Sequence, residues 1–193
     1  MRRARQRRRW CGALTARARF GALALVLSLA PQPLRAEAGQ AASIKNIQVA
    51  MHTLGFLTPP PSGPVDLAVL FDPAEPASVA DLKTISEALE RAPRAGAVPV
   101  RAVPLAVAEL SRLAAFHFVL LTGGLRAYFP AVAEMARGRG VLTISTDLSC
   151  VRADQCVMGV AVEPRVQVLV SRRACEAAGI NFATSFRMMI TEL

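Results

Sequence analysis

Apolar and polar positions follow one another in blocks whose spacing predicts an ordered series of helices and strands. From Ser43, a candidate helix cap, residues 44–57 place apolar side chains at helical spacing, and the proline-rich stretch 58–64 ends this helix. The nearly continuous apolar runs 65–71 and 116–121 are typical of strands that are covered on both faces. The same reasoning predicts further strands at 98–103, 141–145, 157–162 and 166–170, and further helices at 79–92, 105–113, 125–137 and from 171 onward.

The order of these elements predicts a doubly wound α/β fold. Strands that alternate with helices form parallel sheets, because each helix returns the chain to the same end of the sheet. The connection at 163–165 between the last two strands is too short for such a return, so these strands are expected to form an antiparallel hairpin at the sheet edge. Gly179 is expected to interrupt the last helical segment and Asn181 to recap it. The prediction is a three-layer α/β sandwich with a mostly parallel sheet, the edge hairpin and terminal helices packed on the sheet.

The first 36 residues have the composition of an export signal. Nine arginines and no acidic residue precede residue 37, Phe20–Ala30 is an apolar run of eleven residues, and Leu34–Ala36 offers a cleavage site. The apolar run is shorter than the roughly 20 residues that cross a bilayer, so we expect a cleaved signal peptide at 1–36. An uncleaved anchor is the alternative, because Arg35 is unusual beside a cleavage site. The rest suits one domain at 37–193, with an N-terminal helix at 37–58, a Pro-rich linker at 59–64 and an α/β core at 65–193.

The net charge of +9 resides in this leader. Of the 23 basic residues, nine precede residue 37, so 14 basic residues accompany 14 acidic ones in the predicted domain. A balanced domain lacks the basic surface that binds phosphate groups, so we expect no nucleic-acid partner. No apolar stretch after the leader is long and uncharged enough to span a membrane, so we expect no transmembrane segment in the mature chain.

Three cysteines follow the leader. Cys150 and Cys156 are separated by five residues in the loop before the predicted hairpin, a spacing that allows their thiols to meet. Disulfides persist in exported proteins, so we expect this pair to be bridged. The bridge can be a structural staple or a redox-sensitive switch, and the sequence does not decide between the two. Cys175, on the last helical segment, is expected to be a small buried residue.

A ligand cleft is expected where the strands of the sheet end. Open α/β sheets bind ligands beyond the carboxyl ends of their strands, which places Asp72, Gly123, Gly124 and Asp147 in one candidate cleft. The two glycines allow backbone amides to approach an anion, although a Gly-Gly pair after a strand is also an ordinary turn. Asp147 is the carboxylate best placed for chemistry, with capping of the next helix as its structural alternative.

Motifs for catalysis or cofactor binding are scarce. The sequence has neither a phosphate-binding lysine loop nor a GxGxxG spacing, and no GxSxG elbow surrounds Ser145 or Ser149. His52 is expected to be a partly exposed helix residue and His117 a core residue of a strand, so they suggest no metal site. We therefore expect a protein without enzymatic activity, cofactor or metal.

Three segments of the C-terminal half resemble the YfiR/HmsC-like family of periplasmic proteins. They are VLLTGG at 119–124, VLTISTD at 141–147 and VMGVAVEPRVQVLVSRRACEAAGINFATSFRMM at 157–189. The resemblance implies an exported α/β protein that represses a membrane-bound diguanylate cyclase by contacting its periplasmic portion. It also implies that disulfides tune stability, and the family often carries a cysteine pair where Cys150 and Cys156 lie. The first helix departs from the family, because it ends in Gly55–Leu57 without the family's aromatic ending.

These observations favour a non-enzymatic periplasmic regulator that binds an inner-membrane signalling protein, such as a diguanylate cyclase of cyclic di-GMP signalling. Its partner surface is expected on the last helix, at Phe182, Phe186 and Met189, with packing of all three in the core as the structural alternative. The alternative is a periplasmic solute-binding component of a transport system that uses the strand-end cleft. An enzyme relying on Asp147 is a third class. The sequence leaves open whether the chain forms a homodimer.

Overall fold

The computed structural model of the chain describes residues 41–92, 94–95 and 98–193. The predicted signal peptide at 1–36 lies outside the described residues. The described part forms one eight-stranded sheet in the order β2-β3-β1-β4-β5-β6-β7-β8. The strands are β1 (Val65–Phe71), β2 (Arg94–Ala95), β3 (Val98–Ala106), β4 (Phe118–Leu121), β5 (Leu142–Ser145), β6 (Met158–Ala161), β7 (Gln167–Val170) and β8 (Thr191–Glu192).

The central strands are parallel, which confirms the predicted fold class. Strand β1 pairs in parallel with β3 on one side and β4 on the other, and β4, β5 and β6 continue the parallel ladder. Strands β6 and β7 form the expected antiparallel hairpin. The helices are α1 (Ile44–Thr53), α2 (Pro76–Arg91), α3 (Phe129–Ala136), α4 (Leu148–Arg152), α5 (Arg172–Ala178) and α6 (Thr184–Arg187), with 3-10 helices η1 (Leu54–Phe56), η2 (Val107–Ala115) and η3 (Arg126–Tyr128).

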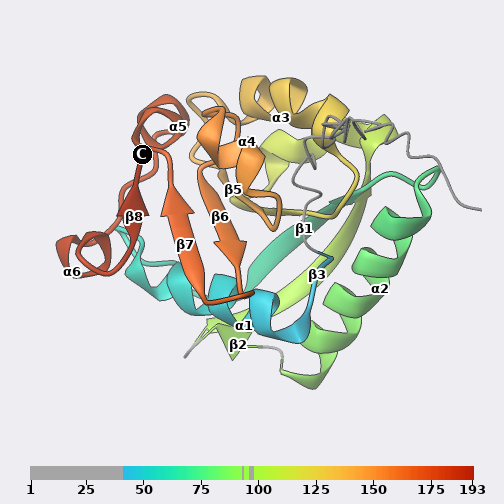
Figure 1. Cartoon of the computed structure of the whole chain (residues 1–193), viewed down its shortest axis with the longest axis horizontal. Coiled ribbons are helices and arrows are strands. Elements are labelled where there is room, and N and C mark those ends of the chain that lie inside the picture. Colours follow the sequence, from blue (N-terminus) through green and yellow to red (C-terminus); the bar gives the residue numbers. More distant parts are fainter. Residues whose placement is uncertain (1–40, 93, 96–97) are drawn as a thin grey trace, which may run out of the picture. The chain divides into compact units, whose positions relative to one another are not determined.

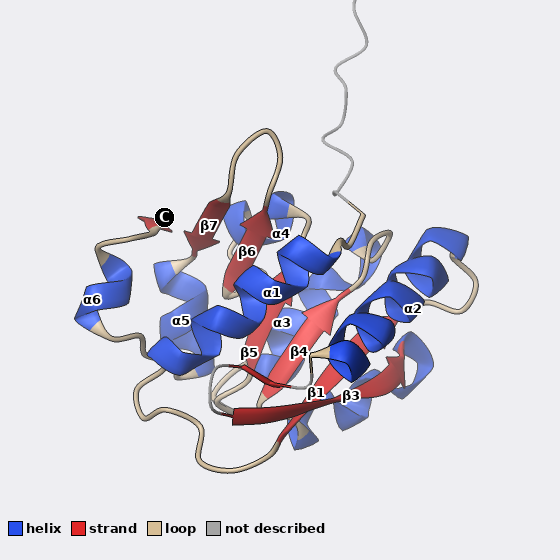
Figure 2. Cartoon of the chain, turned by 90° about the horizontal axis from the view of Figure 1, so that it is seen from below, coloured by secondary structure: helices blue, strands red, loops and turns tan. Residues whose placement is uncertain are grey.

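Helices cover both faces of the sheet, so the fold has three layers. Helices α1 and α2 lie across one face, and α3 and α4 lie on the other (Figures 1 and 2). Strand β1 shows why its sequence is nearly all apolar: Leu67 and Val69 pack into the core beside α1 and α2, while Ala68 and Leu70 pack into the core beside α3 and α4. Successive residues of β1 therefore pack into opposite apolar layers, as the sequence pattern predicts for a central strand.

Helix ends follow local signals in the sequence. Ser43 caps α1, because its side chain accepts a hydrogen bond from the Asn46 backbone N–H at 3.2 Å. Ser171 caps α5 in the same way through the Ala174 N–H at 3.0 Å. Gly179 ends α5 in the left-handed conformation at φ 76°, as expected of a glycine that interrupts a helix.

Four details of the predicted fold are wrong. The hairpin is not at the edge, because β8 pairs in parallel with β7. The helix expected at 105–113 is the 3-10 helix η2, since β3 continues to Ala106 beside β1. Asn181 does not recap a helix, because its carbonyl accepts a hydrogen bond from Thr58 N–H at 2.9 Å in an extended segment. The helix expected to follow Asn181 is only the short α6, whose N-cap is Ala183.

No helix in the described part of the chain is long and apolar enough to cross a membrane.

Candidate functional site

The predicted cleft residues meet at the carboxyl end of the sheet. Asp72 follows β1, Gly123 and Gly124 follow β4, and Asp147 follows β5. These three strands are neighbours and parallel, so the segments that follow them lie at one end of the sheet. The structure therefore brings together the four residues that the sequence assigned to a cleft.

A buried carboxylate already occupies the position in which the glycine amides would hold an anion. Asp81 of α2 is 4% exposed, and its Oδ2 accepts a hydrogen bond from Gly123 N–H at 2.7 Å. Its Oδ1 accepts a second bond from Ala42 N–H at 2.9 Å. A Cβ added to Gly123 would lie 3.1 Å from this carboxylate, so the approach depends on a small residue. Sequence reasoning missed Asp81, but its spacing on α2 was a signal, because it shares a helix face with the buried Ile85.

Asp72 also has its partners within the protein. Its carboxylate accepts hydrogen bonds from Ala74 N–H at 2.9 Å and from the Tyr128 hydroxyl at 3.1 Å. The hydrogen bond to Asp72 and the charge of this carboxylate raise the pKa of Tyr128 above its usual range. Beneath them, the Ser78 hydroxyl accepts a bond from Asp72 N–H at 2.8 Å and meets the hydroxyl of Thr122.

Asp147 holds the start of α4 and an ion pair. Its Oδ1 accepts hydrogen bonds from the Ser149 N–H at 3.0 Å and the Ser149 hydroxyl at 2.7 Å, so it is the N-cap of the helix. Arg126 donates to both carboxylate oxygens, at 2.6 and 3.3 Å. Burial favours the neutral acid, but the hydrogen bonds from Arg126 and Ser149 outweigh it and hold the pKa of Asp147 below its usual range.

The predicted disulfide is present, and it lies beside this end of the sheet. Cys150 of α4 is bonded to Cys156, with their Cα atoms 5.3 Å apart. Both residues are fully buried in the apolar layer under α3 and α4. Cys175 is half-buried rather than buried as expected, since it borders a surface cavity of about 350 Å³ that also contains Glu192. Burial and the charge of Glu192 raise the pKa of the Cys175 thiol to about 12.

The predicted partner surface is only partly exposed. Phe186 is 4% exposed and belongs to the core, because its ring stacks on Phe56 with centroids 5.0 Å apart. Phe182 is half-buried and also packs on Phe186, at 5.0 Å. Met189, by contrast, is 65% exposed, and its neighbour Met188 is 79% exposed. Met189 is therefore the part of the predicted surface that a partner can reach. Its neighbour Met188, which was not predicted to belong to this surface, completes an exposed methionine pair.

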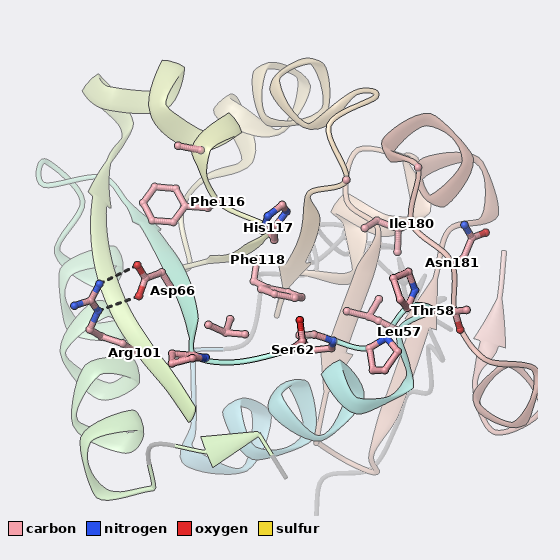
Figure 3. A pocket seen from close by; sticks show the side chains of 18 residues that line it. Leu57, Thr58, Ser62, Asp66, Arg101, Phe116, His117, Phe118, Ile180 and Asn181 are labelled. Atoms are coloured by element: carbon pink, nitrogen blue, oxygen red, sulfur yellow. Dashed lines mark hydrogen bonds and ion pairs between the residues drawn. The ribbon is translucent and has the colours of Figure 1, made fainter. Parts of the chain in front are cut away.

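A large cavity lies at the opposite, amino end of the sheet. It has a volume of about 900 Å³ and lies under the proline-rich loop 58–64, beside the first residues of β1 and β4 (Figure 3). On one wall Arg101 donates two hydrogen bonds to the carboxylate of Asp66, at 2.9 and 2.8 Å. The apolar part of the lining is formed by Leu57, Phe116, Phe118 and Ile180.

Polar side chains with unused hydrogen-bonding groups line this amino-end cavity. Ser62, His117 and Asn181 contribute to its lining, and their side chains form no hydrogen bond to any other described residue. His117 is exposed, which contradicts its predicted place in the core. The reason is that β4 begins at Phe118, so His117 lies where the chain leaves the sheet. The His117 ring lies edge-on to the ring of Phe118, with their centroids 6.5 Å apart.

Comparison with known proteins supports the fold and no narrower assignment. No known family matches the sequence, and no curated protein does. Among solved structures, the chain is similar to the ABC domain in complex with L-Trp from Streptococcus pneumoniae, with a TM-score of 0.56 at 11% identity. It is also similar to a conserved domain protein from Vibrio cholerae O1 biovar El Tor, with a TM-score of 0.55 at 9% identity. These alignments cover 76% and 79% of this chain, which spans 61% of the length of each of those proteins.

Proposed function

We propose that the chain is an exported, non-enzymatic regulator that binds an inner-membrane signalling protein in the periplasm. A diguanylate cyclase of cyclic di-GMP signalling is the partner that the resemblance to YfiR/HmsC-like proteins suggests. The observation that carries the proposal is the exposed methionine pair, at 79% and 65% exposure on the C-terminal segment. Methionine is enriched at protein interfaces, and its flexible apolar side chain adapts to a partner surface.

The methionine pair stands on a rigid base, which favours binding. Beneath it, Phe186 is buried against Phe56. Beside it, Arg187 donates two hydrogen bonds to Glu192 of β8, at 2.6 and 3.0 Å, which ties α6 to the sheet. A surface that is already ordered loses less conformational entropy when a partner binds.

Two features support export. The leader at 1–36 has the charge pattern of a signal peptide. The buried Cys150–Cys156 disulfide suits an oxidising compartment, where such bonds form and persist. Both features agree with a periplasmic site of action.

The strand-end carboxylates support a structural role more than a catalytic one. Asp147 caps α4 and pairs with Arg126, and Asp81 holds two backbone amides. Both carboxylates therefore have hydrogen-bond partners within the protein and need no substrate to satisfy them. An enzyme built on Asp147 would need to break its helix cap or its ion pair during turnover.

A direct binding measurement tests the proposal. The mature protein is titrated against the periplasmic portion of an inner-membrane diguanylate cyclase from the same organism, and the Met188→Asp, Met189→Asp variant is compared with Val166→Asp. Val166 is a matched control, because it is 50% exposed and lies in the β6–β7 turn. We expect the methionine variant to lose at least about 30-fold in affinity, because hot-spot truncations cost about 2 kcal/mol or more, and the control to bind normally. Equal binding by both variants would place the surface elsewhere, and failure of the native protein to bind would overturn the proposal.

A solute-binding role is a second candidate, which the amino-end cavity favours. Its volume of about 900 Å³ suits a small ligand, and Ser62, His117 and Asn181 offer hydrogen bonds. The similar ABC domain was solved in complex with L-Trp, so L-tryptophan is the natural first probe. Calorimetric titration should show saturable binding that His117→Ala and Asn181→Ala weaken. Absence of binding heat at millimolar L-tryptophan would exclude this amino acid as the solute.

A further inference from the structure

The sulfur atoms of this chain differ sharply in their access to solvent. The disulfide sulfurs belong to Cys150 and Cys156, which are fully buried, so the fold shields them from solvent. Met158 is also fully buried, and Met51 is 4% exposed. These residues are closed to reagents in solution as long as the fold is intact.

Among the described residues, the one thiol outside the disulfide is held in its unreactive, protonated form. Cys175 is half-buried, and burial with the charge of Glu192 raises the pKa of its thiol to about 12. At neutral pH it is therefore almost entirely protonated, and the thiolate is the form that reacts with oxidants. Cys175 is not placed to sense oxidation.

Among the described methionines, Met188 and Met189 are the most exposed, whereas Met135 is half-buried. Met188 and Met189 are 79% and 65% exposed and adjacent in sequence, at the end of α6. A thioether reacts without losing a proton, so access to solvent governs its oxidation. Both methionines are accessible, whereas Met51 and Met158 in the core are not.

We propose that Met188 and Met189 form an oxidation site, at which peroxide converts the exposed thioethers to sulfoxides and thereby weakens partner binding. The first half of the proposal concerns this chain alone. The second half rests on the proposed function, because it assigns the same methionines to the partner surface.

The chemical step balances with hydrogen peroxide as the oxidant. A lone pair on the methionine sulfur attacks one peroxide oxygen, so that an S–O bond forms while the O–O bond breaks. The departing hydroxide takes up the proton released from the transferred oxygen, and water is the second product. Sulfur is oxidised by two electrons and the peroxide is reduced by two, with one peroxide consumed for each methionine. Methionine sulfoxide reductases reverse the reaction with a dithiol, which yields a disulfide and water.

The location of the pair explains why oxidation would change binding without unfolding the protein. The two side chains project from the surface, while Phe186 beneath them keeps its place in the core. A sulfoxide is strongly polar, so its desolvation in an apolar interface is unfavourable. We therefore expect at least about a tenfold loss of affinity, which corresponds to roughly 1.4 kcal/mol, and an unchanged melting temperature.

The first experiment needs no partner. The mature protein is treated with hydrogen peroxide, and peptide mass spectrometry follows each methionine over time. We expect Met188 and Met189 to gain one oxygen atom each well before Met51 and Met158, and all of them to react at similar rates in denaturant. If the core methionines react as fast as the exposed pair in the folded protein, the oxidation site is refuted.

The second experiment uses Met188→Leu, Met189→Leu, which keeps an apolar surface that peroxide cannot oxidise. We expect this variant to bind the cyclase portion normally before and after peroxide, whereas the oxidised native protein loses affinity. If Met188 and Met189 are oxidised selectively but partner binding is unchanged, the effect of oxidation on binding is refuted, while the oxidation site itself is supported. If the untreated native protein does not bind, the proposed function and the coupling fall together, while the mass-spectrometric result on the site still stands.

Discussion

The two ends of the sheet use their polar groups in opposite ways. At the carboxyl end, Asp81 and Asp147 are buried: Asp81 accepts hydrogen bonds from backbone amides of other segments, and Asp147 caps its own helix α4. At the amino end, His117 and Asn181 are exposed beside a cavity of about 900 Å³ and form no side-chain hydrogen bond to any other described residue. One end is closed by its own hydrogen bonds, and the other is open.

The order of the parallel strands thus predicts where polar side chains gather, but it does not predict whether they are free to bind a ligand. Parallel strands bring their carboxyl ends together, so loops there collect side chains that can bind a ligand. In this chain α2 supplies Asp81, and the carboxylate takes the position at Gly123 that an external anion would need. The functional surfaces are therefore better sought where exposed groups lack partners, at the amino end and at the methionine pair.

The largest effect is expected when the carboxyl end is opened. Asp81→Ala removes the acceptor for the N–H groups of Gly123 and Ala42, and hydrogen bonds to a charged group contribute about 1.5 to 3 kcal/mol each. Because water can replace part of this, we expect the free energy of unfolding to fall by about 3 kcal/mol. Chemical denaturation measures the change. Glu90→Ala is the control, because this carboxylate is exposed on the same helix. Equal stability of the two variants would show that Asp81 does not close this end.

The disulfide beside the carboxyl end should have the next largest effect. Cys150→Ala, Cys156→Ala opens a loop of seven residues, and the chain-entropy estimate gives a loss of roughly 2 to 2.5 kcal/mol. Thermal unfolding of the variant gives the value, and Cys175→Ala controls for loss of an unbridged cysteine. If native protein treated with reductant keeps its melting temperature while the variant loses stability, the buried bridge is a staple. A reductant that lowers both stability and partner binding would instead support the redox switch.

The central strands could be predicted because their signal is local. The run 65–71 is apolar at both alternating sets of positions, and β1 indeed packs on both layers. The disulfide could be predicted from the spacing of its two cysteines. The convergence of Asp72 and Asp147 could be predicted from the order of the parallel strands that precede them.

Contacts between distant segments could not be predicted in this way. Residues 180–183 are extended because Phe56 and Thr58 bond to their backbone, and no pattern within 180–183 reveals that partner. Strand β8 likewise forms only because β7 offers an open edge. His117 was misplaced for a related reason: the apolar run 116–121 hid the point at which the strand begins.

The pH dependence of stability separates the charge of Asp147 from its capping role. Asp147→Asn keeps a capping oxygen but loses the ionic bonds from Arg126, so we expect a loss of about 1 to 2 kcal/mol at pH 7. Because the pKa of Asp147 is lowered in the folded state, its ionised form stabilises the protein above the unfolded-state pKa of about 4. That contribution disappears as the pH falls through the lower folded-state pKa. Denaturation between pH 2 and pH 7 should show the two proteins converging below about pH 4, and a constant gap would contradict the assignment.

The smallest effect is expected at the open end of the sheet. His117→Ala removes an exposed ring that has no hydrogen-bond partner among the described residues, so the free energy of unfolding should stay within about 0.5 kcal/mol of the native value. Phe118→Ala, one residue along the chain, is the contrast, because its side chain lies in the core at the start of β4 and its loss should cost about 3 kcal/mol. Denaturant titration of both variants gives the comparison. If the loss for His117→Ala reaches about 1 kcal/mol, the ring supports the fold, and the polar groups of the amino end stabilise the protein as those of the carboxyl end do. If only Phe118→Ala is destabilised, the boundary between core and open cavity lies between these two adjacent residues.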